Sequence, residues 1–141
     1  MPKAIFILGL CGSGKSYIAD EIRKTFPAEL MDEGFNTDFE KNYKKLVTNL
    51  REGKNCIIIE IEFCYKDGLR EFIKERLIKD LPKTEIIWKC FENDMDKANQ
   101  NIINRKNKED PKGHIEINLR ISPKYTFPRD AEILPIITDW K

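Results

Sequence analysis

Eight residues near the amino terminus constrain this chain more than any other part of its sequence. The stretch Gly9-Leu10-Cys11-Gly12-Ser13-Gly14-Lys15-Ser16 matches every fixed position of the pattern G-x-x-x-x-G-K-[ST]. It follows a continuous apolar run at residues 4–8 and precedes a segment, 15–26, in which apolar residues repeat every four positions. A strand, a glycine-rich turn and a helix in this order form the context in which the pattern binds phosphate groups, so we predict a P-loop here.

The chemistry of the loop follows from its residue types. Glycines let the backbone wrap a triphosphate with its N–H groups turned inward, and the following helix adds the positive end of its dipole. Lys15 would reach the β- and γ-phosphates, and the Ser16 hydroxyl would ligate Mg²⁺. The predicted nucleotide-binding residues of this segment are Gly9, Cys11, Gly12, Ser13, Gly14, Lys15, Ser16 and Tyr17.

Hydrophobic periodicity predicts strands that alternate with helices along the rest of the chain. The expected strands are residues 4–8, 28–32, 56–63, 85–91 and 132–138. Pro135 interrupts the last one, so we expect it to lie at a sheet edge or to break there. The expected helices are residues 15–26, 39–51, 67–81 with Asp67 as N-cap, and a helix from Asn93 or Asp94 to about Lys106. Residues 107–125 leave two interpretations open, an alternating strand or a short amphipathic helix ended by Pro123. The alternation predicts one α/β domain over residues 1–141, with a doubly wound parallel β-sheet and flanking helices.

Carboxylates at the ends of predicted strands are the candidates for metal binding and acceptor activation. Glu60 and Glu62 lie near the carboxyl end of the third strand, where open α/β sheets bind ligands, and a two-residue period would put both on one face. Glu60 after four apolar residues fits an acid that holds Mg²⁺ or its waters. Asp32 ends the second strand and could accept the proton of a substrate hydroxyl, with Glu33, Asp38 and Glu62 as alternatives. For each, an ordinary solvated carboxylate is the competing interpretation.

Two arginines are candidates for contacts with charged ligands. Arg105, followed by Lys106 and Lys108, could close over the triphosphate and neutralise charge that develops during phosphoryl transfer. The alternative is a basic helix end that complements the helix dipole. Arg70 is either a substrate-side cation or a solvated helix residue, and we favour the first.

Composition argues against several other classes of protein. A net charge of +1 does not indicate electrostatic binding of nucleic acid. No apolar stretch approaches the ~20 residues that span a bilayer, and residues 4–8 are too short for a secretory signal, so we expect a cytoplasmic protein without a membrane partner. The four cysteines form no C-x-x-C pair and only one histidine is present, so we expect core thiols and an incidental Cys11 rather than zinc ligands or disulfides.

At the P-loop the chain resembles the small P-loop kinases, which include shikimate, gluconate, nucleotide and polynucleotide kinases. Residues 57–62, followed by Arg70, are similar to the third-strand segment of the polynucleotide-kinase-like branch. Residues 101–105 look like the start of a lid, which would span about 101–125. Residues 125–128 resemble the stretch that borders the nucleotide base, which adds Pro128 to the predicted binding residues. The resemblance implies the strand order 2-3-1-4-5.

Two functions follow from these residues. The first is a Mg-ATP-dependent kinase that transfers the γ-phosphoryl group to a hydroxyl or phosphate of a small molecule, or of a nucleotide or nucleic-acid end. In it Lys15 and Arg105 would stabilise the transferring group, Asp32 would orient the acceptor, and Ser16 and Glu60 would organise Mg²⁺. The alternative is a non-kinase P-loop module that binds or hydrolyses ATP, or switches conformation with it.

Overall fold

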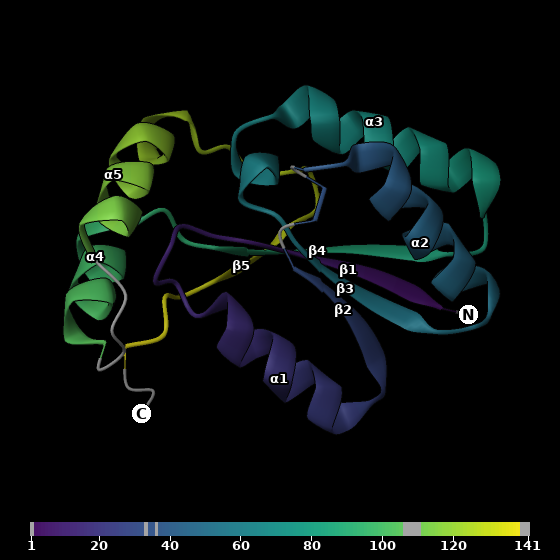
Figure 1. The fold of residues 1–141 in the computed structure, drawn as a ribbon, viewed down its shortest axis with the longest axis horizontal. Coiled ribbons are helices and arrows are strands. Elements are labelled where there is room, and N and C mark those ends of the chain that lie inside the picture. Colours follow the sequence, from purple (N-terminus) through teal and green to yellow (C-terminus); the bar gives the residue numbers. More distant parts are fainter. Residues whose placement is uncertain (1, 33, 36, 106–110, 139–141) are drawn as a thin grey trace.

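The fold is known from a computed structural model that describes residues 2–32, 34–35, 37–105 and 111–138. These residues form a five-stranded parallel sheet in the order β2-β3-β1-β4-β5 (Figure 1). The strands are β1 Lys3–Leu8, β2 Ala28–Asp32, β3 Asn55–Ile59, β4 Glu85–Phe91 and β5 Glu132–Leu134. The predicted α/β class and the strand order 2-3-1-4-5 are both confirmed.

Helices cover both faces of this sheet. They are α1 Lys15–Thr25, α2 Phe39–Arg51, α3 Asp67–Asp80, α4 Met95–Asn104 and α5 Pro111–Ile121, with short 3₁₀ helices η1 Ile61–Cys64 and η2 Ser122–Lys124. Helix α1 lies on one face, and α2 and α3 lie together on the other (Figure 1). Helices α4 and α5 pack against each other beyond the ends of the strands, on the side where β1 leads into α1.

The centre of the sheet explains the apolar run that precedes the P-loop. Strand β1 pairs in parallel with β3 on one side and β4 on the other, and Ala4 through Leu8 are at most 2 % exposed. A strand enclosed in this way needs apolar side chains on both faces. The register pairs Ile7 with Ile59 and Leu8 with Cys90, so β1, β3 and β4 end at the same edge of the sheet.

The third and last strands are shorter than predicted. Strand β3 ends at Ile59 because the Glu60 carboxylate accepts a hydrogen bond from the Glu62 N–H and begins η1, so the prediction of a strand to residue 63 was wrong. Strand β5 ends at Leu134, directly before Pro135, and it is an edge strand, so the structure shows both the break at Pro135 and the edge position that were expected as alternatives.

Helix boundaries follow the predictions with small shifts. The N-cap of α3 is Lys66 rather than Asp67, which is the first helical residue, and Asp94 is the N-cap of α4, with its carboxylate accepting from the Lys97 N–H. In the ambiguous segment the helix interpretation holds, since α5 runs from Pro111 to Ile121 and Pro123 lies in η2.

The cysteines match the expectation of core thiols. Cys56, Cys64 and Cys90 are buried thiols that form no disulfide, and Cys11 is a half-buried residue of the P-loop. Within the described ranges, no cluster of three or more His, Cys, Asp or Glu side chains could hold a metal ion. None of the helices in that part of the chain is long and apolar enough to span a bilayer.

Candidate active site

The P-loop needs glycine at two positions because of its backbone conformation and its neighbours. Gly12 and Gly14 have φ angles of +86° and +108°, in the left-handed region that residues with a side chain rarely adopt. A Cβ on Gly12 would lie 2.4 Å from the carbonyl oxygen of Ala98 in α4, and one on Gly14 would lie 2.6 Å from Cγ1 of Ile137. The loop is therefore enclosed between α4 and the segment that follows β5.

The amino end of α1 is suited to an anion. Its N-cap, Gly14, provides no side-chain hydrogen bond, and the first turn carries no acidic residue. The first N–H groups of a helix have no partner within the helix, and together with the helix dipole they attract phosphate. Ser16 lies in this first turn with Tyr17, and both side chains are exposed.

Lys15 and Ser13 supply two further signs of a phosphate site. The Lys15 ammonium donates a hydrogen bond to the Gly9 carbonyl, with Nζ and O 2.8 Å apart, so its charge lies across the mouth of the loop. Ser13 is fully buried, and its Oγ has no hydrogen-bond partner among the described residues. An unpaired buried hydroxyl is costly in a folded protein, so it is consistent with a ligand that completes this loop.

Two acids lie at the carboxyl ends of the neighbouring strands, Asp32 as the last residue of β2 and Glu60 directly after β3. Asp32 ends β2 and pairs in register with Ile59, which in turn pairs with Ile7, so β2, β3 and β1 present Asp32, Glu60 and the P-loop in that spatial order. Glu60 is only 1 % exposed, whereas Asp32 is exposed. Adjacent strands lie about 4.8 Å apart, so the backbone of Asp32 lies roughly 10 Å from β1 and from the P-loop that follows it, with β3 between them.

The rival acids have other roles in the structure. Glu62 lies in η1 rather than on a strand, so the prediction that it shares a strand face with Glu60 was wrong. Its carboxylate pairs with Lys66, with Oε1 and Nζ 2.7 Å apart. Asp38 caps α2 by accepting from the Lys41 N–H. Glu33 lies outside the described residues.

The two arginines have different positions. Arg105 is half-buried and is the C-cap of α4. Helix α4 lies against the P-loop, since Ala98 and Ile102 are the residues that a Cβ on Gly12 would meet. Arg105 therefore directly follows a helix that packs on the loop. Lys106 and Lys108 are not among the described residues.

Arg70 is 5 % exposed, so it is not a solvated helix residue. Its guanidinium donates hydrogen bonds to the Phe63 carbonyl and to the carbonyl and hydroxyl of Thr126. Through these bonds Arg70 of α3 joins η1 to the segment after η2. They therefore give no support to the favoured substrate-side role.

Pro128 lies in the segment between η2 and β5. The Thr126 N–H donates to the Cys64 carbonyl, and the Ala131 N–H donates to the Pro128 carbonyl. Arg129 and Asp130 then line a surface depression with Ile86, Ile87 and Trp88 of β4. These hydrogen bonds join the segment to η1 and to itself rather than to the P-loop, so the role of Pro128 at the nucleotide base stays a prediction.

Three residues that the sequence analysis did not single out contact the P-loop backbone directly. They are Asn101 of α4, Asn118 of α5 and Ile137. Each asparagine interrupts an otherwise apolar stripe at helical spacing, with Ala98 and Ile102 in α4 and with Ile117 and Ile121 in α5. That pattern indicates a polar group on a buried helix face, but it does not identify the P-loop as its partner.

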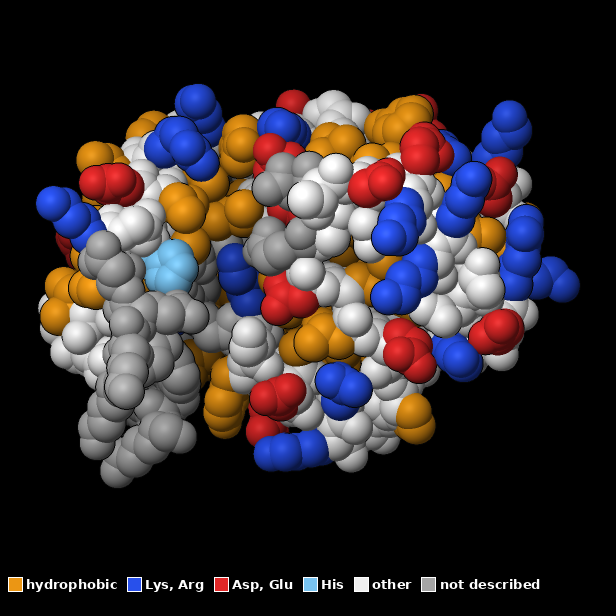
Figure 2. Space-filling model, viewed as in Figure 1, with side chains coloured by type: hydrophobic (Ala, Val, Ile, Leu, Met, Phe, Trp, Pro, Cys, Tyr) orange, Lys and Arg blue, Asp and Glu red, His pale blue; other side chains and the backbone are white. Residues whose placement is uncertain are grey.

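The surface of the molecule is hollowed between the α4–α5 side and the main body (Figure 2). A Lys or Arg side chain is visible in the depth of this hollow, with acidic atoms beside it (Figure 2). Over the rest of this face basic and acidic side chains are interspersed, so no large patch of one sign appears there.

Comparisons with known proteins agree with this arrangement at the level of fold. No family model and no curated protein matches the chain. A solved sugar kinase from Janibacter sp. HTCC2649 is 13 % identical, with a TM-score of 0.67 over 96 % of this chain and 84 % of its own. A gluconokinase from Sinorhizobium meliloti 1021 is 12 % identical, with a TM-score of 0.57 over 96 % of this chain and 83 % of its own. With its P-loop after the central strand and its strand order, this chain has the fold of the small P-loop kinases.

Proposed function

We propose that this protein is a Mg-ATP-dependent phosphotransferase that moves the γ-phosphoryl group to a hydroxyl or phosphate acceptor. The observation that carries the proposal is the P-loop, which has left-handed Gly12 and Gly14 and an uncapped helix α1. It lies at the same sheet edge as the buried carboxyl of Glu60 and the exposed carboxyl of Asp32. A loop, a metal-side acid and an acceptor-side acid at one edge are the parts that phosphoryl transfer requires.

On the nucleotide side the protein provides charge and directed N–H groups. Lys15 and the first turn of α1 would bind the β- and γ-phosphates and stabilise the charge that spreads over the transferring group. The Ser16 hydroxyl and the Glu60 carboxylate are hard oxygen ligands or water acceptors of the type that Mg²⁺ prefers. A bound Mg²⁺ would neutralise charge on the β- and γ-phosphate oxygens.

On the acceptor side Asp32 is the leading candidate base. Its exposed side chain begins two strands away from the loop, so it can face an acceptor without competing for the nucleotide. It would orient the acceptor hydroxyl and take its proton as the new P–O bond forms. Arg105 would add positive charge from the end of α4.

A small polyhydroxylated acceptor is the first class to test. The two solved structures above are named as a sugar kinase and a gluconokinase, and they share this fold over most of their length. The net charge of +1 gives no electrostatic reason to prefer a nucleic-acid end.

The alternative, a P-loop module that does not transfer phosphate, also has a sequence feature to test. Asn107-Lys108-Glu109-Asp110 fits the N-K-x-D pattern that GTPases use to select guanine. In this chain the tetrapeptide comes after α4 rather than directly after a strand of the sheet. The nucleotide tests should therefore include GTP beside ATP.

The decisive experiment is transfer from γ-labelled ATP or GTP to a panel of acceptors. The panel should contain sugars, sugar acids, nucleosides, nucleoside monophosphates and 5′-hydroxyl oligonucleotides. We expect a labelled product from one class, and no product with Lys15→Ala, because that change removes the charge that the motif places on the phosphates. If no acceptor accelerates nucleotide consumption by the wild type, the binding module is the better description. Wild-type turnover by Lys15→Ala would show that the chemistry occurs elsewhere.

A further inference from the structure

Three consecutive carbonyl groups of the P-loop accept hydrogen bonds from distant parts of the chain. The Cys11 carbonyl accepts from Nδ2 of Asn118 at 2.9 Å, and the Gly12 carbonyl accepts from Nδ2 of Asn101 at 2.9 Å. The Ser13 carbonyl accepts from the backbone N–H of Ile137 at 3.1 Å. The loop is thus held from its outer side by α4, α5 and the segment after β5.

These contacts determine where the N–H groups of the loop point. In a trans peptide the carbonyl of one residue and the N–H of the next point in opposite directions, and the described peptides include no cis bond. With the carbonyls of Cys11, Gly12 and Ser13 turned outward, the N–H groups of the following residues turn inward. The Ser13 N–H closes the turn on the Leu10 carbonyl at 3.2 Å. By the same peptide geometry, the N–H groups of Gly12 and Gly14 should point to the interior of the loop.

Asn118 contributes more than one of these bonds. Its side chain is fully buried, and its Oδ1 accepts from the Cys11 N–H at 2.8 Å, so one amide engages both backbone groups of Cys11. Its Nδ2 also donates to Oδ1 of Asn99 at 3.0 Å, which fixes the orientation of the amide. A buried amide with all of these partners resists rotation, and so does the peptide that it holds.

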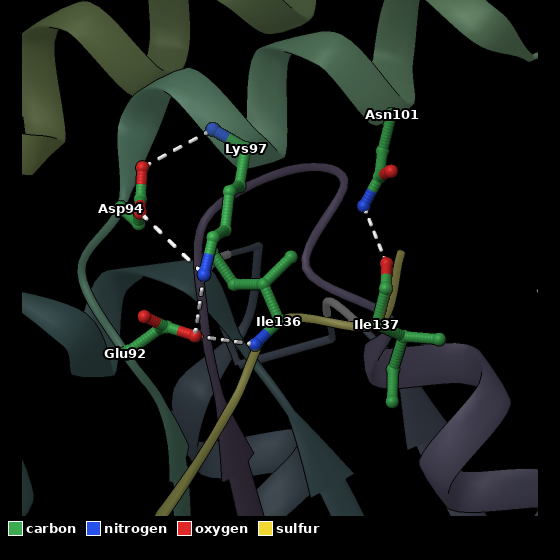
Figure 3. A network of polar contacts seen from close by, with 6 residues as sticks. All are labelled: Glu92, Asp94, Lys97, Asn101, Ile136 and Ile137. Atoms are coloured by element: carbon green, nitrogen blue, oxygen red, sulfur yellow. Dashed lines mark hydrogen bonds and ion pairs between the residues drawn. The ribbon is translucent and has the colours of Figure 1, made fainter. Parts of the chain in front are cut away.

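Asn101 connects the loop to the segment after β5. Its Nδ2 donates to the Ile137 carbonyl at 2.6 Å (Figure 3). The same Nδ2 donates to the Gly12 carbonyl. The adjacent Ile136 N–H donates to the Glu92 carboxylate at 2.9 Å, and Lys97 approaches the same carboxylate at 3.7 Å (Figure 3). These contacts fix the backbone of Ile137 where its own N–H reaches the Ser13 carbonyl.

We propose that Asn101 and Asn118 are positioning residues of the nucleotide site, which hold the P-loop in its phosphate-binding conformation before the nucleotide arrives. The proposal rests on the nucleotide-binding part of the proposed function and does not depend on the acceptor. A loop that is not held samples other conformations, and apparent affinity falls in proportion to the fraction of molecules that are competent to bind. Purely structural amides would instead affect stability alone.

The test compares Asn118→Leu with the matched control Asn55→Leu. Asn55 also holds two backbone groups, accepting from the Lys3 N–H at 2.9 Å and donating to the Pro27 carbonyl at 3.3 Å, but at the amino end of the sheet, away from the loop. Two quantities are measured on each folded variant: the Kd for Mg-ATP and Mg-GTP, and amide hydrogen exchange across residues 9–16 without nucleotide. For Asn118→Leu we expect Kd to rise roughly 10- to 100-fold and exchange at Cys11 and Gly12 to accelerate. For Asn55→Leu we expect wild-type values of both.

Other outcomes separate this proposal from the proposed function. Unchanged exchange at Cys11 in Asn118→Leu would overturn the positioning role, and so would an equal rise in Kd for both variants. If Asn118→Leu does not fold, Asn101→Ala is the second variant. It releases the Gly12 and Ile137 carbonyls but leaves the contacts of Cys11 in place, and its exchange and Kd should change in the same direction. If the wild type binds neither nucleotide, the proposed function fails, and with it a nucleotide role for the two asparagines, even if exchange shows that they hold the loop.

Discussion

Gly12→Ala is the substitution for which the structure gives the sharpest expectation, because Gly53 provides a matched control. Both glycines have left-handed backbones, with φ of +86° at Gly12 and +82° at Gly53. A Cβ on Gly53 would meet nothing within 4 Å, whereas a Cβ on Gly12 would lie 2.4 Å from the Ala98 carbonyl oxygen. The pair therefore separates the cost of the backbone conformation from the cost of the collision.

The loss of stability that comes from the left-handed backbone alone should be similar in both variants. A left-handed residue with a Cβ costs ~1–2 kcal/mol. The loss of chain entropy in the unfolded state on replacing glycine by alanine returns about 0.4–1 kcal/mol. We expect Gly53→Ala to lower the free energy of unfolding by about 1 kcal/mol and to leave nucleotide affinity unchanged.

Gly12→Ala carries a second cost. Ordinary van der Waals contact begins at 3.4 Å, so the loop must move about 1 Å away from a helix carbonyl that cannot rotate aside. That movement separates the Gly12 carbonyl from Asn101, and a buried carbonyl that loses its hydrogen-bond donor costs ~1–3 kcal/mol. The total loss is then about 2–4 kcal/mol, and the displaced loop should bind Mg-ATP at least ~10-fold more weakly.

Urea unfolding and calorimetric titration with Mg-ATP measure these two effects. An unchanged denaturant m-value would confirm that stability rather than the compactness of either state has changed. If Gly12→Ala proved no less stable than Gly53→Ala and bound Mg-ATP with wild-type affinity, the packing of the loop against α4 would have to be different from the one described.

Three further predictions concern the metal, the acceptor and pH. Ser16→Ala should weaken the dependence of ATP affinity on Mg²⁺, because the hydroxyl is a proposed direct ligand; titration with and without metal measures this, and an unchanged requirement would remove Ser16 from the metal site. Asp32→Asn should keep ATP affinity but lower phosphoryl transfer at least ~10²-fold, and parallel losses of both would place Asp32 on the nucleotide side or in a structural role. Burial raises the pKa of the Cys56 and Cys90 thiols from 9.0 to about 12, so the unfolded chain loses these protons first and the free energy of unfolding should fall as pH rises from 9 toward 12. Urea midpoints across this range should show a smaller decline in a Cys56→Ala, Cys90→Ala variant, and an identical decline would mean that burial does not hold these thiols protonated.

The central part of the fold was predictable because its signals are local. The apolar run before the P-loop, the motif itself and the helical stripe of α1 are all read within about twenty residues, and they required a buried parallel strand followed by a helix. The end of β3 was less predictable than the end of β5, which Pro135 marks. The hydrogen bond from the Glu62 N–H to the Glu60 carboxylate ends one strand early, and no pattern of apolar residues encodes such a bond.

The segment before η2 was ambiguous because its apolar residues satisfy two periods. Leu119 decides between them, since a strand with alternating faces would bury it with Ile117 and Ile121, yet it is 62 % exposed. The helical face instead contains Ile117, Asn118 and Ile121. Asn118 on that face makes the helical pattern of apolar residues harder to recognise in the sequence. Its place there is explained by its hydrogen bonds to Cys11 in the P-loop.

The outer support of the P-loop could not be predicted, since its hydrogen bonds join residues far apart in the chain. Asn101 and Gly12 are separated by 89 positions, and Asn118 and Cys11 by 107. The motif specifies the residues that face the phosphates, which must be glycines, a lysine and a residue with a hydroxyl group. The outward carbonyls need only a donor, and two different kinds meet that need here, side-chain amides at Cys11 and Gly12 and a backbone N–H at Ser13. A chain with the same inner face could therefore use other donors on the outer side of its P-loop. The residues that face the phosphates can therefore be identified from the sequence, whereas the groups that bind the outward carbonyls are identified only from the structure.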